Sequence, residues 1–343
     1  MKKIAWLLVA VLLLTCLASC KNQARSELEK AFTTVSVNGG VKIVHYSGNY
    51  STLEIPSTIG GKTVVEIGDD VFAKSYLLTE VVIPDTVKVI GARAFQGCLA
   101  LERIVIPDSV TEIGEYAFFG CWAAKSLEIG ENLNKMGDQA IQYCKSLEKI
   151  VVSKDNNTYK TSDDGVLFTA DYKTLLCYPG SAPMTSYTVP NNCKNIADYA
   201  FRNSSKLEKL TIGEQVTEIG DGAFYACEKL KEVTFAASVE YLGYSTFADC
   251  ASLEEIIIPQ GVKTIGYLIE QGECGSTFDG CVSLRRVVLP ASLTNIYANS
   301  FLECAALTEV DFCGSQSEWK NVIVGQGNDT LTMATIRYDY DVE

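Results

Sequence analysis

Residues that could carry chemistry are unevenly distributed in this chain, which has thirteen cysteines and many carboxylates but a single histidine, His45. A Ser-His-Asp or Cys-His hydrolase needs a histidine beside its nucleophile, and histidine-based zinc sites draw on the same residue type. His45 lies in a stretch of alternating apolar and polar residues that predicts a strand. We therefore expect a surface or partly packed strand residue there, and we predict no catalytic residues.

Most of the cysteines recur at one position of a repeated segment, namely Cys98, Cys121, Cys144, Cys227, Cys250, Cys281 and Cys304. Cys193 replaces a valine elsewhere in the repeat, and no pair has CxxC spacing. If the copies stack, the recurring β-carbons point in parallel, which is poor geometry for a disulfide. We predict a ladder of buried thiols that act as small hydrophobes. Any disulfide should involve Cys177, Cys274 or Cys313, which lie off the ladder.

Carboxylates number 42, so their abundance alone does not exclude a glycosidase, which needs only two. No local sequence singles out such a pair, and repeat stacks seldom close a deep pocket. Residues 155–157 (DNN) and 163–165 (DDG) would suit calcium, but neither matches an EF-hand loop and turn chemistry explains both. The sequence therefore predicts no enzyme, no metal site and no cofactor.

A repeat of 23 residues sets the spacing of these residues along the chain. The segment VVIPDTVKVIGARAFQGCLALER at residue 81 returns as IVIPDSVTEIGEYAFFGCWAAKS at residue 104 and as LTIGEQVTEIGDGAFYACEKLKE at residue 210. Ten copies span residues 53–309, and three of them are longer, at residues 53–80, 150–186 and 256–286. This period predicts a solenoid whose extra residues leave the stack as loops.

Within a copy, apolar residues recur at positions 1, 3, 7, 10, 14, 15, 18 and 21, so stacked copies should form columns of equivalent side chains. Positions 1 to 3 are short β-branched runs that predict one parallel sheet along the solenoid, with short helical or irregular segments on the other side. A glycine follows position 10 in most copies. It marks a turn that needs a positive φ or no side chain, although Ala197 and Tyr297 break the pattern.

Position 2 and the residue before position 1 should point outward from the strands. The candidate ligand-binding face is the set Val82, Arg103, Val105, Glu128, Lys149, Thr188, Lys209, Thr211, Glu232, Thr234, Glu255, Ile257, Arg286 and Val288. The alternative is that β-branched residues stand there only because they favour extended backbone. A second candidate is a hairpin within residues 166–178, expected to project from the expanded copy at 150–186. The alternative is that this hairpin only bridges two halves of the stack.

The ends of the chain predict export and capping. Residues 1–19 have the charges and the short apolar run of a signal peptide, and the sequence LASC ending at Cys20 resembles a bacterial lipobox. Cys20 would then carry the lipid. Cys16 fits less well, and an ordinary cleaved signal peptide is the alternative. Residues 20–31 predict a lipid anchor and tether, residues 32–52 a capping hairpin, and residues 310–343 a carboxy-terminal cap.

The segment IPDSVTEIGEYAFFGC at residues 106–121 resembles the repeat of BspA-type leucine-rich-repeat proteins, a family of bacterial surface proteins. The resemblance covers residues 53–309, and the ending at residues 314–336 is also similar to the family's closure. It implies a curved solenoid, display at the cell surface and, in some relatives, adhesion to host proteins or other bacteria. It implies no enzyme and transfers no binding residue.

A net charge of −13 with dispersed lysines and arginines argues against nucleic acid as a partner and leaves the lipid as the means of membrane attachment. We therefore predict a lipoprotein of the cell envelope, in the outer membrane and facing outward, that binds an unknown protein or glycan. The alternative is a periplasm-facing structural scaffold, and a secreted enzyme comes third.

Overall fold

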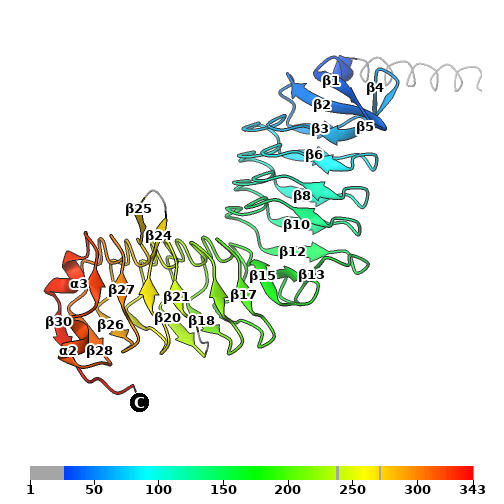
Figure 1. Cartoon of the computed structure of the whole chain (residues 1–343). Helices are drawn as coiled ribbons and strands as arrows, with labels where there is room; N and C mark the ends of the chain where they lie inside the picture. Colours follow the sequence, from blue (N-terminus) through cyan, green and yellow to red (C-terminus); the bar gives the residue numbers. More distant parts are fainter. Residues whose placement is uncertain (1–26, 237–238, 270–271, 343) are drawn as a thin grey trace, which may run out of the picture.

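The computed structural model describes residues 27–236, 239–269 and 272–342. They form a β-solenoid of about 13 turns with about 23 residues each and little helix, which confirms the predicted fold class. Each turn of the solenoid carries a short strand on one side, a two-residue strand on the next and a run of tight turns (Figure 1). In the described residues of the repeats, turns and two-residue strands occupy the side where helical or irregular segments were expected.

The first row of strands begins at the residue before position 1 of each copy. It comprises β3 (Thr52–Glu54), β6 (Glu80–Val82), β8 (Arg103–Ile106), β10 (Ser126–Ile129), β12 (Lys149–Val152), β16 (Ser186–Thr188), β18 (Lys209–Ile212), β20 (Glu232–Phe235), β22 (Glu255–Ile257), β26 (Arg286–Leu289), β28 (Glu309–Phe312) and β30 (Thr335–Arg337). Paired strands are parallel and in register with the repeat, so that Arg103, Ser126 and Lys149 are neighbours across β8, β10 and β12.

The second row lies around position 10. It comprises β5 (Lys62–Ile67), β7 (Val89–Ile90), β9 (Glu112–Ile113), β11 (Lys135–Met136), β17 (Asn195–Ile196), β19 (Glu218–Ile219), β21 (Tyr241–Leu242), β23 (Thr264–Ile265), β27 (Asn295–Ile296) and β29 (Ile323–Val324). These strands also pair in parallel with the next copy.

The prediction of one sheet along the whole solenoid is wrong. The first row is divided into the ladders β3-β6, β8-β10-β12, β16-β18-β20 and β22-β26-β28-β30, and the second row also breaks after β11. Both rows are interrupted at the expanded copy, residues 150–186, because its extra strands β13 (Tyr159–Thr161), β14 (Leu167–Thr169) and β15 (Thr174–Cys177) separate the copies on either side.

The stack bends at this expanded copy (Figure 1). We call residues 27–149 the amino-terminal arm and residues 187–342 the carboxy-terminal arm. Two clusters of buried hydrophobic residues correspond to the arms, and β14 joins them, since Leu167 belongs to the first cluster and Phe168 to the second. The bend is therefore a packed junction and not a hinge of exposed loop.

The hairpin of residues 166–178 does not project, contrary to the prediction; it bridges the two halves of the stack, as the alternative had it. β14 and β15 pair antiparallel, but Val166, Leu167, Phe168 and Leu175 are fully buried, and β15 pairs in parallel with β17. Both faces of the hairpin carry apolar side chains, so it is built into the junction. The segment that projects is β24 (Tyr267–Ile269) with β25 (Gly272–Cys274), within the longer copy at 256–286 (Figure 1).

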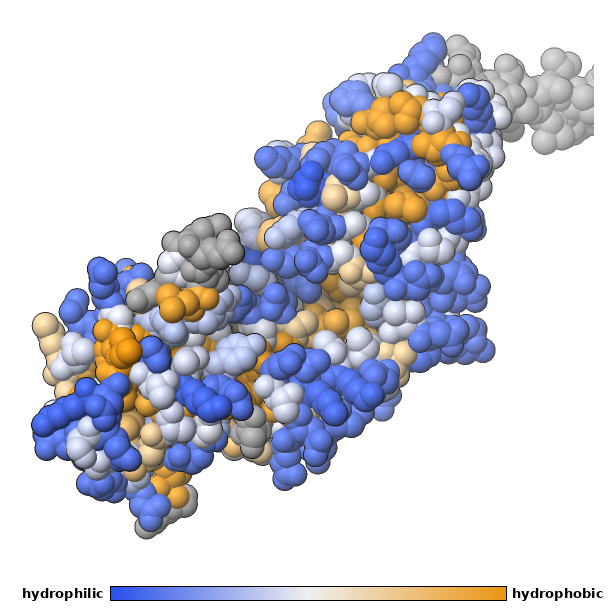
Figure 2. All heavy atoms as spheres, in the orientation of Figure 1, coloured by the Kyte–Doolittle hydropathy of each residue, from blue (hydrophilic) through white to orange (hydrophobic). Residues whose placement is uncertain are grey.

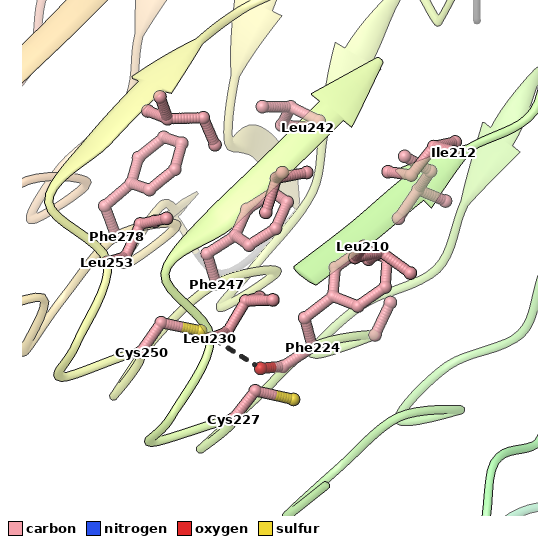
Figure 3. Packing of buried hydrophobic residues seen from close by; sticks show 14 of the residues in the cluster. Leu210, Ile212, Phe224, Cys227, Leu230, Leu242, Phe247, Cys250, Leu253 and Phe278 are labelled. Carbon is pink, nitrogen blue, oxygen red and sulfur yellow. Dashed lines mark hydrogen bonds between the residues drawn. The ribbon is translucent and has the colours of Figure 1, made fainter. Parts of the chain in front are cut away.

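The core consists of the expected columns. In the copy at 104–126 every apolar repeat position is buried, and rings of neighbouring copies stack, as with Phe224 and Phe247, whose centroids lie 4.9 Å apart (Figure 3). Burying each such ring contributes about 1.5–3 kcal/mol, offset by chain entropy. Tyr178 supplies the ring in the expanded copy and stacks on Phe201. Met136 is only partly buried, because the second row of strands ends beside it.

The glycine after position 10 is required by close packing. Gly114 does not have a positive φ, but a β-carbon there would lie 2.5 Å from the amide nitrogen of Ala92. Ala197 and Tyr297 follow the two expanded copies at 150–186 and 256–286, where the preceding turn is replaced by β15 or by β24. The residue with a left-handed backbone conformation lies two positions after this glycine, and in the copy at 104–126 it is Tyr116.

Both ends of the stack are closed by pairing. At the start, β1 (Phe32–Val37) and β2 (Gly40–Tyr46) form an antiparallel hairpin, β2 pairs in parallel with β5, and β4 (Thr58–Ile59) pairs antiparallel with β5. Leu28, in the predicted tether, packs against this first cluster. At the other end, β29 and β30 extend the two rows, and α2 (Gln316–Trp319) and α3 (Asp329–Met333) follow β28 and β29.

Candidate functional site

The recurring cysteines are buried, but each also donates a hydrogen bond. The Sγ of Cys250 donates to the carbonyl oxygen of Phe224 in the preceding copy, at 3.3 Å (Figure 3). All seven ladder cysteines make the equivalent bond. The thiol column therefore satisfies carbonyls of the phenylalanine column, which the interpretation as small hydrophobes missed. Where the ladder is interrupted, Ser204 donates to the carbonyl of Phe201 in its own copy.

Burial raises the pKa of Cys98, Cys227 and Cys304 to about 12 in each case. Because the thiolate is the nucleophile and the metal ligand, these three thiols have no reactive form near neutral pH. Cys177 and Cys313, which lie off the ladder, are free as well, and the side chain of Cys274 is outside the described part of the chain.

His45 is exposed on β2 and faces Thr33 across the hairpin. Within residues 27–236, 239–269 and 272–342, no three histidine, cysteine, aspartate or glutamate side chains converge as a metal site would require. In the same ranges, no helix is long and apolar enough to cross a membrane. Cys20, the predicted lipid attachment site, lies outside the described residues.

The candidate ligand-binding face is mostly open to solvent. Its exposed members are Val82, Arg103, Lys149, Thr188, Lys209, Glu232, Thr234, Glu255 and Ile257, and its partly exposed members are Val105, Glu128, Thr211 and Arg286. They come from successive strands of the first row, so the structure brings them into two parallel lines, one of charges and one of β-branched side chains that Glu128 interrupts. The bend divides each line between the two arms.

Val288 is the exception, because it is fully buried and cannot contact a ligand. It stands between Ile257 and Asp311 in the outward line. Asp311 is buried between Arg286 and Arg337, and the ring of Tyr340 lies 5.2 Å from the Arg286 guanidinium. The last residues of the chain therefore fold back over this end of the face, an effect that the repeat pattern could not reveal.

Most charges of the face are paired with one another, although Lys149 makes no ion pair among the described residues. Arg103 bonds Glu128 at 2.6 Å in the amino-terminal arm, and Lys209 bonds Glu232 at 2.6 Å in the carboxy-terminal arm. Arg286 likewise bonds Glu255. Exposed pairs of this kind contribute about 0–1 kcal/mol each to stability. They neutralise most of the charges and leave Val82, Val105, Val151 and Ile257 as the apolar part of the face.

A hollow of about 260 Å³ lies on this face between β6 and β8. It is lined by Val82, Arg103 and Val105 together with Glu80 and Glu102. Pockets for small molecules usually hold about 300–1,000 Å³ and bury most of the ligand. The size of this hollow suits one or two side chains of a macromolecular partner better than a small ligand.

Sequence reasoning missed a second surface, near the second row of strands. Two hollows of about 470 and 420 Å³ meet there and share Asp198. Desolvation raises the pKa of Asp198, and its Oδ1 accepts a hydrogen bond from the amide of Asp221 at 2.8 Å. Asp221 in turn accepts from the amide of Tyr244 at 3.0 Å. These carboxylates therefore tie successive copies together, a structural role.

An aromatic cluster lies at the bend. The guanidinium of Arg202 lies 4.3 Å from the ring centroid of Tyr143 and 5.6 Å from that of Phe119, both in the amino-terminal arm. It also lies 5.2 Å from Tyr199 and 5.0 Å from Tyr225, in the carboxy-terminal arm. The two arms thus touch directly across the expanded copy. Aligning the copies by their 23-residue period would have shown the recurring aromatic residues, but not this contact.

The family model described as "BspA type Leucine rich repeat region" matches in 6 copies, over residues 44–163, 176–269 and 274–324. The match covers well over half of the chain. The chain belongs to the BspA-type leucine-rich-repeat family. The resemblance inferred from residues 106–121 is thereby confirmed, and the BspA-type repeat accounts for the columns and turns described above.

Solved structures support the same BspA-type architecture. A leucine-rich cell surface protein from Faecalibacterium prausnitzii is 26% identical, with a TM-score of 0.57, and the alignment covers 85% of this chain and 96% of that one. The pneumococcal vaccine antigen PcpA is 22% identical with a TM-score of 0.74, over 90% and 88% of the two chains, and shows the shared fold. No curated protein matches the chain.

Proposed function

We propose that this chain is a lipid-anchored protein of the bacterial cell surface that binds a protein or glycan partner through the exposed face of its first row of strands. Surface location is supported by the BspA-type repeats and by the similarity to a leucine-rich cell surface protein from Faecalibacterium prausnitzii. Attachment through Cys20 rests on the lipobox sequence.

The observation that carries the binding proposal is the exposed β-branched line between paired charges. Val82, Val151 and Ile257 are 49%, 45% and 41% exposed, although valine and isoleucine favour burial. An apolar centre with a polar rim is typical of protein interfaces. The buried hairpin at residues 166–178 is no longer a candidate, and neither is the covered end of the face around Val288.

A triple variant tests this surface, with Val82→Asp, Val151→Asp and Ile257→Asp introduced into the full chain. Val35→Asp is the matched control, because Val35 is 46% exposed but lies on β1, away from the face. We would screen matrix proteins, glycan arrays and bacterial cells. Binding that is lost in the folded triple variant and kept in the control supports the proposal. Binding that survives in both variants refutes this face as the site.

Location and anchor are tested separately. Protease treatment of intact cells should cleave the protein if it faces outward, whereas protection until lysis would favour the periplasm-facing scaffold. Cys20→Ala should move the protein from the membrane fraction to the soluble fraction, because acyl chains contribute about 0.8 kcal/mol per buried methylene to membrane binding. Retention of Cys20→Ala on the membrane would contradict the lipid anchor.

A further inference from the structure

Apolar side chains line the turns of the amino-terminal arm, on a surface distinct from the sheet face. We call this set the aromatic edge: Tyr76, Leu77, Leu99, Phe119, Trp122 and Tyr143. Leu77 is 63% exposed, Tyr76 56% and Trp122 39%, and the other three are partly exposed. The side of the molecule that Figure 2 shows is largely hydrophilic, with hydrophobic patches over the first copies and over the carboxy-terminal arm.

Backbone hydrogen bonds hold this edge in line. Tyr76, Leu99 and Trp122 are each 23 residues apart in the sequence. The amide of Ala123 donates to the carbonyl of Leu99 at 3.1 Å, and the amide of Ser146 donates to that of Trp122 at 3.1 Å. The side chains therefore stand one above another along successive copies, on a rigid framework that needs little ordering when a partner binds.

The rings at the end of the edge nearest the bend are packed together. Tyr143 lies 5.7 Å from Trp122 in an edge-on arrangement and 5.4 Å from Phe119, measured between ring centroids. Arg202 fixes this group from the other arm, as described above. Trp, Tyr and Arg are the residue types enriched among those that dominate the energy of protein interfaces.

A cation stands at this end of the edge without a carboxylate beside it. Lys145 is exposed, and its Nζ lies 4.5 Å from the ring centroid of Trp122 and 5.0 Å from that of Tyr143. Among the described residues it makes no ion pair, and neither does Lys149 on the sheet face, whereas Arg103 and Lys209 are paired. In a chain of net charge −13, an uncompensated cation between exposed rings favours an anionic group on a partner.

We infer that the aromatic edge is a docking surface for a polypeptide that packs apolar side chains on Trp122 and Tyr143 and brings an aspartate or glutamate to Lys145. Leu77, Leu99 and Phe119 carry no polar side-chain atom, and sugar hydroxyls desolvated against them would lack hydrogen-bond partners. A protein segment is therefore favoured over a glycan. The inference rests on the proposed binding role but uses a different surface from the sheet face.

A library of randomised twelve-residue peptides displayed on phage is the probe. It would be selected on the full chain with no prior depletion on any variant, and enriched peptides would be synthesised and their dissociation constants measured. We expect sequences that combine an acidic residue with aromatic or branched apolar residues. Trp122→Ala and Lys145→Glu should each weaken binding about tenfold or more, while Lys145→Arg stays within about threefold.

The variant Val82→Asp, Val151→Asp, Ile257→Asp should leave peptide binding unchanged, so failure of the sheet-face proposal and failure of this one give different results. Circular dichroism confirms that each variant is folded. Peptides that bind Trp122→Ala as well as the native chain would overturn the inference. Trp122-dependent binding on a glycan array, with no enriched peptide, would also overturn it and assign the edge to a glycan.

Discussion

At the residue scale, the side chains at the repeat positions form hydrogen bonds with the backbone as well as filling the core. Ser204 occupies, in an earlier copy, the repeat position that Cys250 occupies in its own copy. Both side chains donate a hydrogen bond to a phenylalanine carbonyl. A purely hydrophobic requirement would admit alanine or valine there. The shared property of cysteine and serine is a hydrogen-bond donor on a small side chain, and this explains why serine can replace cysteine in the column.

The donor role predicts different costs for two substitutions of Cys250. Cys250→Ala removes both the bond to Phe224 and some core volume, and should lower the free energy of unfolding by about 1–3 kcal/mol. Cys250→Ser keeps a donor and should cost less. Urea denaturation of both variants measures the difference, with Cys313→Ala as an off-ladder control. Equal costs for serine and alanine would show that the thiol serves only as a hydrophobe.

The same thiols predict a dependence of stability on alkaline pH. Folded Cys98 has a pKa raised by burial to about 12, against 9.0 for the free group. Above pH 9 the unfolded chain releases a proton that the folded chain retains, so stability is present below that pH and falls as pH rises. The slope is about 1.4 kcal/mol per pH unit for each such thiol.

Urea denaturation between pH 8 and pH 10.5 measures this slope. In Cys98→Ser, the free energy of unfolding should fall less steeply with pH, by about 1.4 kcal/mol per pH unit, because serine does not titrate in this range. The comparison between the two proteins subtracts the contributions of the other ladder cysteines and of buried tyrosines. An unchanged slope in the variant would contradict the burial of that thiol.

At the element scale, the turn after position 10 depends on the turn beneath it. A β-carbon on Gly114 meets backbone atoms of the preceding copy, whereas Ala197 follows an expanded copy in which β15 replaces that turn. The same local sequence position therefore has different requirements in different copies. Tyr297, which follows the copy with the projecting β24 and β25, obeys the same rule.

This rule predicts that Gly114→Ala is destabilising even though its φ suits alanine. The β-carbon would lie 2.5 Å from the Ala92 nitrogen, and separating the copies should cost about 1–3 kcal/mol, a typical overpacking penalty. Ala197→Gly is the matched control and should cost about 1 kcal/mol or less, the usual effect of added backbone freedom. Thermal and urea denaturation measure both. Similar costs would show that conformational preference, not close approach, selects glycine.

At the scale of the whole molecule, the bend combines two repeat stacks into one shape. The clusters of the two arms meet at β14, and Arg202 links rings from both arms on the turn side. In repeat proteins each copy contacts only its neighbours, so the two arms can unfold cooperatively only through the contacts at the junction. The arms are therefore expected to unfold together only while the junction is intact.

Removing the link at Arg202 should loosen the bend. Its Nε has no hydrogen-bond partner in the described ranges, so the ring contacts are its main interactions. Arg202→Ala should cost about 0.5–2 kcal/mol. It should also separate the unfolding of the arms into two calorimetric transitions and broaden the distance distribution from small-angle X-ray scattering. Lys145→Ala, on the exposed edge, is the control and should leave both unchanged. One transition and an unaltered scattering curve for Arg202→Ala would contradict this role.

The sequence by itself determined the period, the buried columns, the parallel strands and which side chains of the first row point outward. These follow from local repetition, since residues 23 apart must occupy equivalent places in a stack. Thirteen of the fourteen candidate face residues are at least partly exposed for this reason, and Val288 is the exception.

Only the tertiary structure decided the position of the bend, the burial of the hairpin at residues 166–178, the covering of Val288 and the aromatic cluster around Arg202. Each of these depends on contacts between residues that the period does not relate, such as Tyr340 with Arg286 or Arg202 with Tyr143. Departures from the repeat determine these contacts, and their packing is fixed only when the copies on both sides have stacked.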